Sequence, residues 1–143
     1  MRFGWCLLWA FALAGCASQP VIAPHGVVSN NPCIDAVLAH IAMPGQVTAV
    51  SIYSHDPDSA SAPLAWARQL PAIGMSAEEL LLARPKMVLT GNLASSGTNA
   101  VLARAGIQTL ALGVAPTIAD DMQQIRTIAA ALGRGDAGEA LIS

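Results

Sequence analysis

Short apolar runs alternate along the chain with longer segments in which apolar residues recur at helical spacing. Four runs are nearly continuously apolar, as expected for strands buried on both faces: residues 25–29, 47–51, 86–90 and 107–112. The segments between them repeat apolar residues every three or four positions, which indicates amphipathic helices. This alternation predicts an α/β fold in which helices flank both faces of a parallel sheet.

Capping residues define where the predicted helices begin and end. Asn31 and Pro32 supply the cap and the first helical position before a helix over residues 33–42. Thr117 caps a longer helix with one apolar face, and Gly133 ends it. These signals are local, so they fix the helix starts without knowledge of the tertiary structure.

Residues 74–90 are the most informative stretch, because they read as a capped helix that leads into a buried strand. Ser76 and Glu79 form a capping box, in which each side chain satisfies a donor at the helix start. Arg84-Pro85 ends the helix, since the residue before a proline is disfavoured in the helical region. The apolar run at 86–90 then predicts a strand.

In a parallel sheet, ligands bind beyond the carboxyl ends of the strands. The loops that follow three of the predicted strands are Asn30-Asn31, the turn-rich loop 53–63 that begins with Tyr53, and residues 91–97. We therefore expect these three loops to open on one edge of the sheet.

The first residues form an export signal. Arg2 is the positive region and residues 6–13 are an apolar core that is too short for a bilayer span of about 20 residues. Leu-Ala-Gly-Cys, ending at Cys16, resembles the lipobox of bacterial lipoproteins, which implies acylation of this cysteine; ordinary cleavage after Ala17 is the alternative. We assign residues 1–17 to the signal peptide and 18–25 to a tether.

Composition narrows the function classes. The net charge of the chain is −2 and no basic run occurs, which argues against a nucleic-acid surface. After removal of the signal, Tyr53 and Trp66 are the only aromatic residues. Cys33 is then the only thiol besides Cys16, so a disulfide framework is excluded within the folded body.

Six sequence segments, in order and at suitable spacing, resemble the N-terminal lobe of the substrate-binding proteins that serve ABC importers of iron-siderophores, haem and cobalamin. The segments read VVSNNPCIDAVLA, VSIYSHDP, LPAIGMSAEELLLARPKMVL, TGN, LARAGIQTLAL and TIADDMQQIRTIAAALGR. The chain departs from the family pattern at Asn30, where a leucine is usual, and at Lys86, where an aspartate is usual.

The resemblance implies that residues 26–143 form one lobe of a two-lobe periplasmic-binding fold and end in the interlobe region. The second lobe would then be absent and the sequence a fragment, with a natural one-lobe protein as the alternative. It also implies non-covalent capture of an iron-siderophore, haem or corrinoid and its delivery to ABC permease subunits. No cofactor and no enzymatic activity are expected. The location would be periplasmic, with a lipid anchor in the outer membrane of a Gram-negative cell.

Carried over by position, the resemblance and the loop order assign ligand binding to Asn31, Tyr53, His55, Gly91 and Asn92. Tyr53 matches an aromatic residue that lines the pocket of cobalamin-binding members. His55 and Asp56 are expected either to bond a polar edge of the cargo or to cap the turn at Pro57. Trp66 lies on an apolar helical stretch and is expected to pack in the core.

Glu78 matches the glutamate that docks this family's lobe onto an arginine pocket of the permease. The simpler interpretation is an acid that stabilises the helix dipole by ~0.3–1 kcal/mol without any partner. Because Glu79 already serves the capping box, Glu78 is available for docking.

Three alternatives remain open. Cys33 beside Asp35 at a helix start could give a reactive thiolate, although a lone cysteine usually acts as a small buried hydrophobe. His25, Cys33, His55 and Asp56 could bind Zn or Mn, although their spacing fits no compact ligand pattern. The third alternative is an outer-membrane lipoprotein that acts as an adaptor and binds no small ligand.

Overall fold

The structure, a computed structural model, describes residues 25–91 and 96–143. Five parallel strands form one sheet in the order β3-β2-β1-β4-β5. In chain order the strands are β1 (Val27–Ser29), β2 (Val47–Ser51), β3 (Ala72–Ile73), β4 (Met87–Gly91) and β5 (Gln108–Leu112). The helices are α1 (Pro32–Ile41), the 3-10 helix η1 (Ile52–His55), α2 (Leu64–Ala67), α3 (Ala77–Ala83), α4 (Ser96–Arg104), α5 (Ile118–Ala131) and α6 (Gly135–Ile142).

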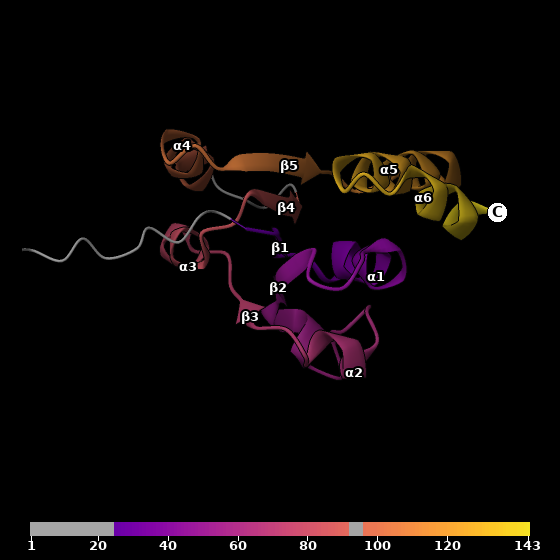
Figure 1. Cartoon of the computed structure of the whole chain (residues 1–143), viewed down its shortest axis with the longest axis horizontal. Helices are drawn as coiled ribbons and strands as arrows, with labels where there is room; N and C mark the ends of the chain where they lie inside the picture. Colours follow the sequence, from indigo (N-terminus) through magenta and orange to yellow (C-terminus); the bar gives the residue numbers. More distant parts are fainter. Residues whose placement is uncertain (1–24, 92–95) are drawn as a thin grey trace, which may run out of the picture.

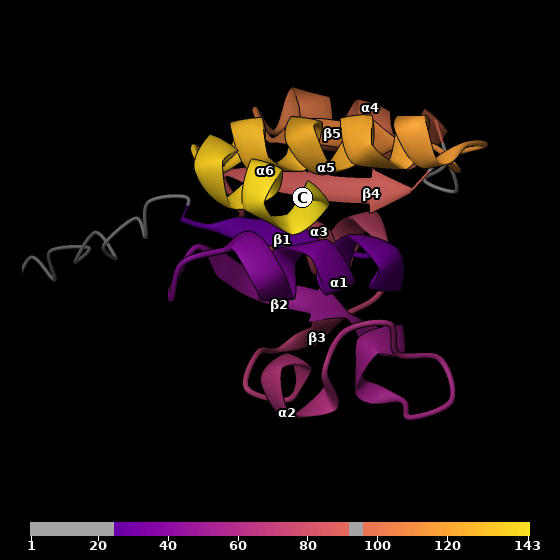
Figure 2. The same cartoon turned by 90° about the vertical axis from the view of Figure 1, so that its right-hand side faces the viewer.

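Helices cover both faces of the sheet (Figure 1). Helices α1, α5 and α6 pack side by side on one face, and α3 and α4 lie on the other (Figures 1 and 2). The predicted fold class is therefore confirmed: the described residues form one α/β lobe with a parallel sheet between two helical layers. None of the helices in the described ranges combines the length and apolarity needed to cross a bilayer.

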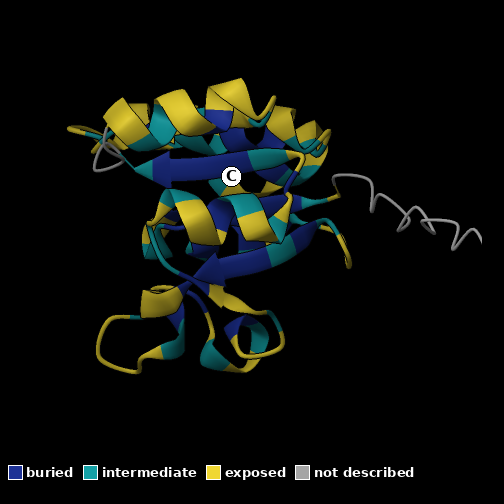
Figure 3. Ribbon diagram, turned by 90° about the vertical axis from the view of Figure 1, so that its left-hand side faces the viewer, coloured by how far each residue is buried: buried dark blue, intermediate teal, exposed yellow. Residues whose placement is uncertain are grey.

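The sheet separates two hydrophobic clusters, because successive residues of a strand point to opposite faces. Val27 belongs to the cluster under α1 and α5, whereas Val28 belongs to the cluster under α3 and α4. Figure 3 shows the result: β1, β2 and β4 are largely buried, and the helices turn their exposed sides outward. The edge strand β5 is mostly exposed, which corrects the prediction that all four apolar runs are buried on both faces. Leu38, Val50 and Leu89 lie in the first cluster, and Leu80, Val88 and Leu102 in the second.

A register shift between β1 and β2 explains why Val47 and Ala49 face opposite sides of the sheet although two positions apart. Val27 pairs with Val47, but Val28 pairs with Ala49, so Thr48 is the extra residue. Gly26 lies against Thr48 with a φ of 63°, and a Cβ at this position would collide with the Thr48 side chain. Only glycine fits there without strain.

The helix starts agree closely with the capping signals. Asn31 Oδ1 accepts from the Cys33 and Ile34 amides at 2.8 and 3.3 Å, and Thr117 caps α5 through the Asp120 amide. At α3, Ser76 Oγ accepts from the Glu79 amide at 3.2 Å, as predicted. The Glu79 carboxylate accepts from the Ser76 hydroxyl at 2.7 Å and from the Gly74 amide at 3.4 Å, which closes the capping box.

Arg84, the residue before Pro85, ends α3 in the left-handed region, with φ 45° and ψ 51°. Three elements were not predicted. These are the edge strand β3, the 3-10 helix η1 within the predicted loop, and the final helix α6.

Candidate functional site

The candidate site is the edge of the sheet where the parallel strands end, which we call the rim. It consists of Asn30-Asn31 after β1, η1 after β2, Gly91 at the end of β4, and residues 113–118, which run from the end of β5 to the first residue of α5. Asn92 follows Gly91 but lies outside the described residues. The expectation that the loops after β1, β2 and β4 open on one edge agrees with the parallel strand order.

Asn31 and Gly91 meet at the centre of the rim. A Cβ at Gly91 would lie 2.7 Å from Asn31 Nδ2, so the amide packs directly on the glycine backbone. Because Asn31 Oδ1 is used to cap α1, its Nδ2 is the end that faces β4. Because Gly91 has no side chain, the loop after β1 and the end of β4 can lie in contact.

Tyr53 is presented on η1 with 47% of its surface exposed, beside Ile52 at 46%. The Tyr53 amide donates to Ser51 Oγ at 3.3 Å. The side chains on either side of this pair, those of Ser51 and Ser54, are buried. The turn thus exposes one aromatic and one aliphatic side chain above a buried polar base.

Asp35 forms that base, and sequence reasoning gave it no role at the rim. It is fully buried, and its Oδ2 accepts from the Ser51 amide at 2.9 Å and from the Ser54 hydroxyl at 2.6 Å. Within the described residues, Oδ1 has no hydrogen-bond partner, because the nearby Ser29 hydroxyl donates to Asn31 O. A sequence signal was present: Asp35 lies beside Ile34 and Leu38 on the apolar face of α1.

Burial raises the pKa of the Asp35 carboxyl above its ordinary 3.8. The neighbouring hydroxyls of Ser29 and Ser54, the Ser51 amide and the charge of His55 each act to lower that pKa, but desolvation is the largest influence. The buried polar side chains of the described chain all gather in this region: Ser29, Asn30, Asp35, Ser51, Ser54 and Thr90.

His55 anchors the other end of the turn. Its Nε2 lies 3.0 Å from Ala67 O and 3.1 Å from Leu70 O, and since both partners are acceptors, Nε2 carries the hydrogen. Arg68 Nη2 donates to His55 O at 3.2 Å. This side of the imidazole is therefore bound to the backbone around α2 and is not directed at the rim.

Asp56 takes the second of its two expected roles, because it caps the turn. It accepts from the Asp58 amide at 3.2 Å and from the Ser59 hydroxyl at 2.7 Å. The Ser59 hydrogen bond, followed by the Asp58 amide, lowers the pKa of the Asp56 carboxyl.

Two further residues singled out in the sequence, Glu78 and Trp66, are not part of the rim. Glu78 is exposed in the first turn of α3, which starts shortly after the carboxyl end of β3. Trp66 packs partly buried against the larger core cluster, as expected. Cys16 lies outside the described residues.

Cys33 is exposed, which corrects the expectation that a lone cysteine here would be a buried hydrophobe. It precedes the buried turn of α1 and is absent from the network around Asp35. In residues 25–91 and 96–143, no three His, Cys, Asp or Glu side chains come together as metal ligands. His25 precedes β1 and Cys33 follows it, so they lie at opposite ends of that strand, and the proposed Zn or Mn set does not assemble.

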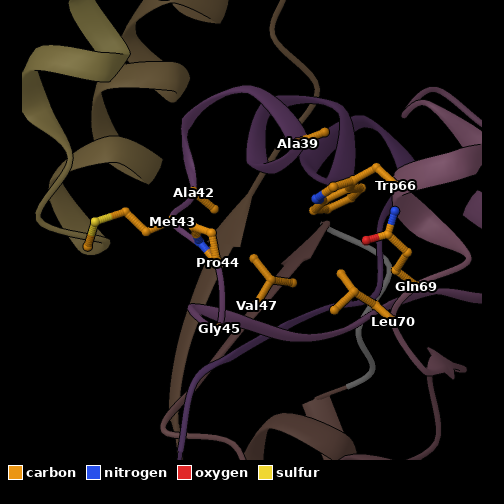
Figure 4. A pocket seen from close by; sticks show the side chains of 9 residues that line it. All are labelled: Ala39, Ala42, Met43, Pro44, Gly45, Val47, Trp66, Gln69 and Leu70. Carbon is orange, nitrogen blue, oxygen red and sulfur yellow. The ribbon is translucent and has the colours of Figure 1, made fainter.

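A pocket of about 400 Å³ lies elsewhere, between the end of α1, the start of β2 and α2. Figure 4 shows Trp66, Gln69 and Leu70 on one wall, facing Val47. No charged side chain lines it, and it opens at the amino end of β2, away from the rim. The rim is a better candidate site because exposed apolar groups, polar groups and a helix start converge there.

The chemistry of the rim suits binding. It offers an exposed aromatic ring, aliphatic side chains and an amide, and most of the polar groups around them serve backbone or side-chain hydrogen bonds; the buried Asn30 Nδ2 and Asp35 Oδ1 are the exceptions among the described residues. Within the described residues, Asp35 is surrounded by hydroxyl and amide donors that would hold a charge in place rather than activate a nucleophile.

The family model described as a periplasmic binding protein matches residues 27–143. No curated protein matches the chain. Among solved structures, the chain is similar to the periplasmic haem-binding protein of Roseiflexus sp. RS-1 in its apo form. Identity is 28%, the TM-score is 0.66, and the match covers 84% of this chain and 45% of that chain.

Two further structures share the fold. A periplasmic haem-binding protein from Pseudomonas aeruginosa is 20% identical, with a TM-score of 0.68 and coverage of 83% of this chain and 42% of that one. The periplasmic haem-binding protein of Vibrio cholerae is 19% identical, with a TM-score of 0.69 and coverage of 82% and 45%. The chain therefore spans less than half of the length of these structures.

Proposed function

Because the chain belongs to the periplasmic binding protein family, we propose that it is the substrate-binding component of an ABC importer and supplies half of a ligand site. The rim is the ligand-facing surface in this proposal. Capture is non-covalent, since a ligand enclosed against an apolar surface with a few fixed polar groups is held without bond chemistry.

The distribution of exposed apolar side chains carries the proposal. Among the described residues, half of the large hydrophobic side chains that are exposed lie on the rim: Ile52 and Tyr53 on η1, Val114 after β5, and Ile118 at the start of α5. Val114 and Ile118 are 90% and 77% exposed. Such a concentration at one edge, around a polar centre, is typical of a surface that binds a largely apolar partner.

The charged residues around the rim favour one class of cargo over another. Acidic residues flank the rim on both sides: Asp56 and Asp58 follow η1, and Asp120 and Asp121 begin α5. Arg68 is the basic group that the described residues place beside η1, and it is bonded to His55 O. This surface favours haem or a corrinoid, which have broad uncharged faces, over a highly anionic iron-siderophore.

Each ligand-binding residue receives a role on this basis. Tyr53 supplies a ring face for stacking on a macrocycle. Asn31 and Gly91 form the floor, where the backbone can approach the ligand closely. His55 contributes through the turn that it anchors. Asn92 lies outside the described residues and is proposed as a ligand contact only because it follows Gly91 in the sequence.

Replacement of Tyr53 tests the proposal. Tyr53→Ala should weaken binding of haemin or cyanocobalamin about tenfold, the loss expected of one aromatic contact worth ~1.4 kcal/mol. The measurement is a spectroscopic titration of the purified protein with each probe and with a ferric tricatecholate, which should bind least tightly.

Met43→Ala is the matched control. Met43 is exposed to 48%, nearly the same as Tyr53, but it lines the pocket between α1 and α2. Binding should be unchanged in this variant. A loss in Met43→Ala with none in Tyr53→Ala would move the site to that pocket and contradict the assignment to the rim.

The family is periplasmic, and a lipid anchor at Cys16 would hold the protein at a membrane facing that compartment. We expect Cys16→Ser to abolish incorporation of labelled palmitate and release the protein into the soluble periplasmic fraction. Unchanged fractionation would leave ordinary signal cleavage as the better explanation.

A further inference from the structure

We propose that Asp35 is the positioning residue of the Tyr53 turn: one buried carboxylate oxygen on α1 holds η1 in the orientation that presents Tyr53 at the rim. The relevance of this geometry to cargo rests on the proposed function. The geometry itself can be tested without any ligand.

The two hydrogen bonds to Asp35 come from residues on either side of Tyr53 in the sequence. Oδ2 accepts from the Ser51 amide at 2.9 Å and from the Ser54 hydroxyl at 2.6 Å, so the residues before and after the Ile52-Tyr53 pair are held by the same atom. The Ser51 hydroxyl then accepts from the Tyr53 amide at 3.3 Å. A carboxylate acceptor makes such bonds shorter and stronger than a neutral group would.

The far side of the turn is held independently. His55 Nε2 donates to the carbonyls of Ala67 and Leu70, which fixes the end of η1 to the segment around α2. With one end held by α1 and the other by α2, the backbone at Tyr53 has little freedom. The ring is therefore ordered before a ligand arrives, which reduces the entropy lost on binding.

A stabilising role alone does not explain the choice of an aspartate. A fully buried carboxylate carries a desolvation penalty, and Oδ1 is left without a partner in the described residues. When both partners of a buried hydrogen bond are replaced together by apolar groups of similar shape, stability is often almost unchanged. What the carboxylate adds is a fixed geometry for the chain that leaves β2.

The test uses the fact that Tyr53 is the only tyrosine of the chain. Selective ¹⁵N-tyrosine labelling of the ligand-free protein gives one amide signal, whose order parameter reports the rigidity of the turn. We expect a rigid value of about 0.85 in the unmodified protein and a value below about 0.6 in Asp35→Ala. Ser54→Ala, which removes one of the two bonds to Oδ2, should give an intermediate value.

Two further variants separate positioning from general stability. Asp35→Asn retains one oxygen that can accept both hydrogen bonds and should restore most of the rigidity. Leu80→Ala creates a cavity in the cluster on the opposite face of the sheet and should leave the Tyr53 amide unchanged. Unchanged order in Asp35→Ala and Ser54→Ala, or an equal loss in Leu80→Ala, would overturn the proposal.

A binding measurement with haemin then connects the turn to the proposed function. Asp35→Ala should weaken haemin binding about tenfold when Tyr53 is present, and should have no further effect in Tyr53→Ala, because the two substitutions act through one group. Equal effects in both backgrounds would contradict the positioning role. If haemin does not bind the unmodified protein, the proposed function fails with this probe, while the order parameters still decide the role of Asp35.

Discussion

Buried polar side chains gather at the edge of the sheet that we propose as the ligand-facing surface. Ser29, Ser51 and Ser54 have too little apolar surface to belong to a core, yet each is buried beside Asp35 at the carboxyl ends of β1 and β2. A buried polar group must be hydrogen-bonded to avoid a large free-energy penalty. These residues therefore support one another as a network, and replacement of one affects the others.

The raised pKa of Asp35 has a consequence for stability. Because the folded state holds this proton more tightly than the unfolded state, the contribution of Asp35 to the unfolding free energy increases as pH falls from its folded pKa to about 3.8. Outside that interval the contribution is constant. The difference in unfolding free energy between the unmodified protein and Asp35→Asn should therefore rise on acidification in this range, as measured by urea denaturation.

Asp56→Asn provides a control of opposite sign. The pKa of Asp56 is lowered, chiefly by the Ser59 hydroxyl, so its stabilisation is present at neutral pH and is lost as pH falls through the folded pKa. The difference between the unmodified protein and this variant should decrease on acidification. If both differences in unfolding free energy changed in the same direction with pH, burial would not be the dominant influence on the pKa of Asp35.

At the scale of elements, the sequence predicted those features whose cause is local. The starts of α1, α3 and α5 follow from capping side chains, and each cap makes the expected hydrogen bond. Strand β3 has two residues and exists because it pairs with Val50 and Ser51, a non-local cause. Helix α6 has no side-chain cap and contains two glycines, so its sequence gives little helical signal.

The packing of α6 on α5 explains its presence. Gly138 is buried, and a Cβ there would lie 2.5 Å from the Ala129 Cβ, so the two helices approach closely. Glycine at this position makes the contact possible at the expense of helix propensity. Arg126 and Glu139 add an exposed ion pair at 2.8 Å, which contributes little.

Gly138→Ala should consequently destabilise the lobe. The added methyl forces α6 away from α5, with a typical overpacking cost of 1–3 kcal/mol, offset by about 1 kcal/mol of helix propensity. Gly135→Ala in the same helix meets no atom within 4 Å and should be neutral or stabilising. Urea denaturation of both variants distinguishes these outcomes, and equal stability would show that the helices can separate without cost.

At the scale of the whole molecule, the convergence of the loops after β1, β2 and β4 at one edge was predictable, because the strands of the described sheet are all parallel. The sequence did not reveal how these loops are held. The sequence marks Asp35 only as an acid on the apolar face of α1, and its role depends on Ser51 and Ser54 folding over it. His55 likewise acquires its partners only when α2 packs beside η1.

The exposed acid at the start of α3 allows a test of the lobe as part of a transport system. Glu78 lies in the first turn of α3, and Asp121 occupies the corresponding region of α5. Each carboxylate stabilises its helix dipole by ~0.3–1 kcal/mol, so a charge reversal at either position should lower stability by a similar small amount. If the two charge-reversal variants differ strongly in transport activity, the difference must therefore come from a contact that Glu78 or Asp121 makes outside the lobe.

We expect Glu78→Arg to abolish stimulation of the permease ATPase, because an arginine would face the basic pocket proposed on the permease, and like charges across an interface are strongly unfavourable. Cargo affinity should stay within about twofold, since Glu78 lies outside the Asp35 and Tyr53 network. The assay uses the full-length protein with its permease in proteoliposomes, and Asp121→Arg should retain stimulation. If both variants stimulate equally, Glu78 serves only the helix dipole; if both fail, the rim as a whole is repelled and docking is not specific to α3.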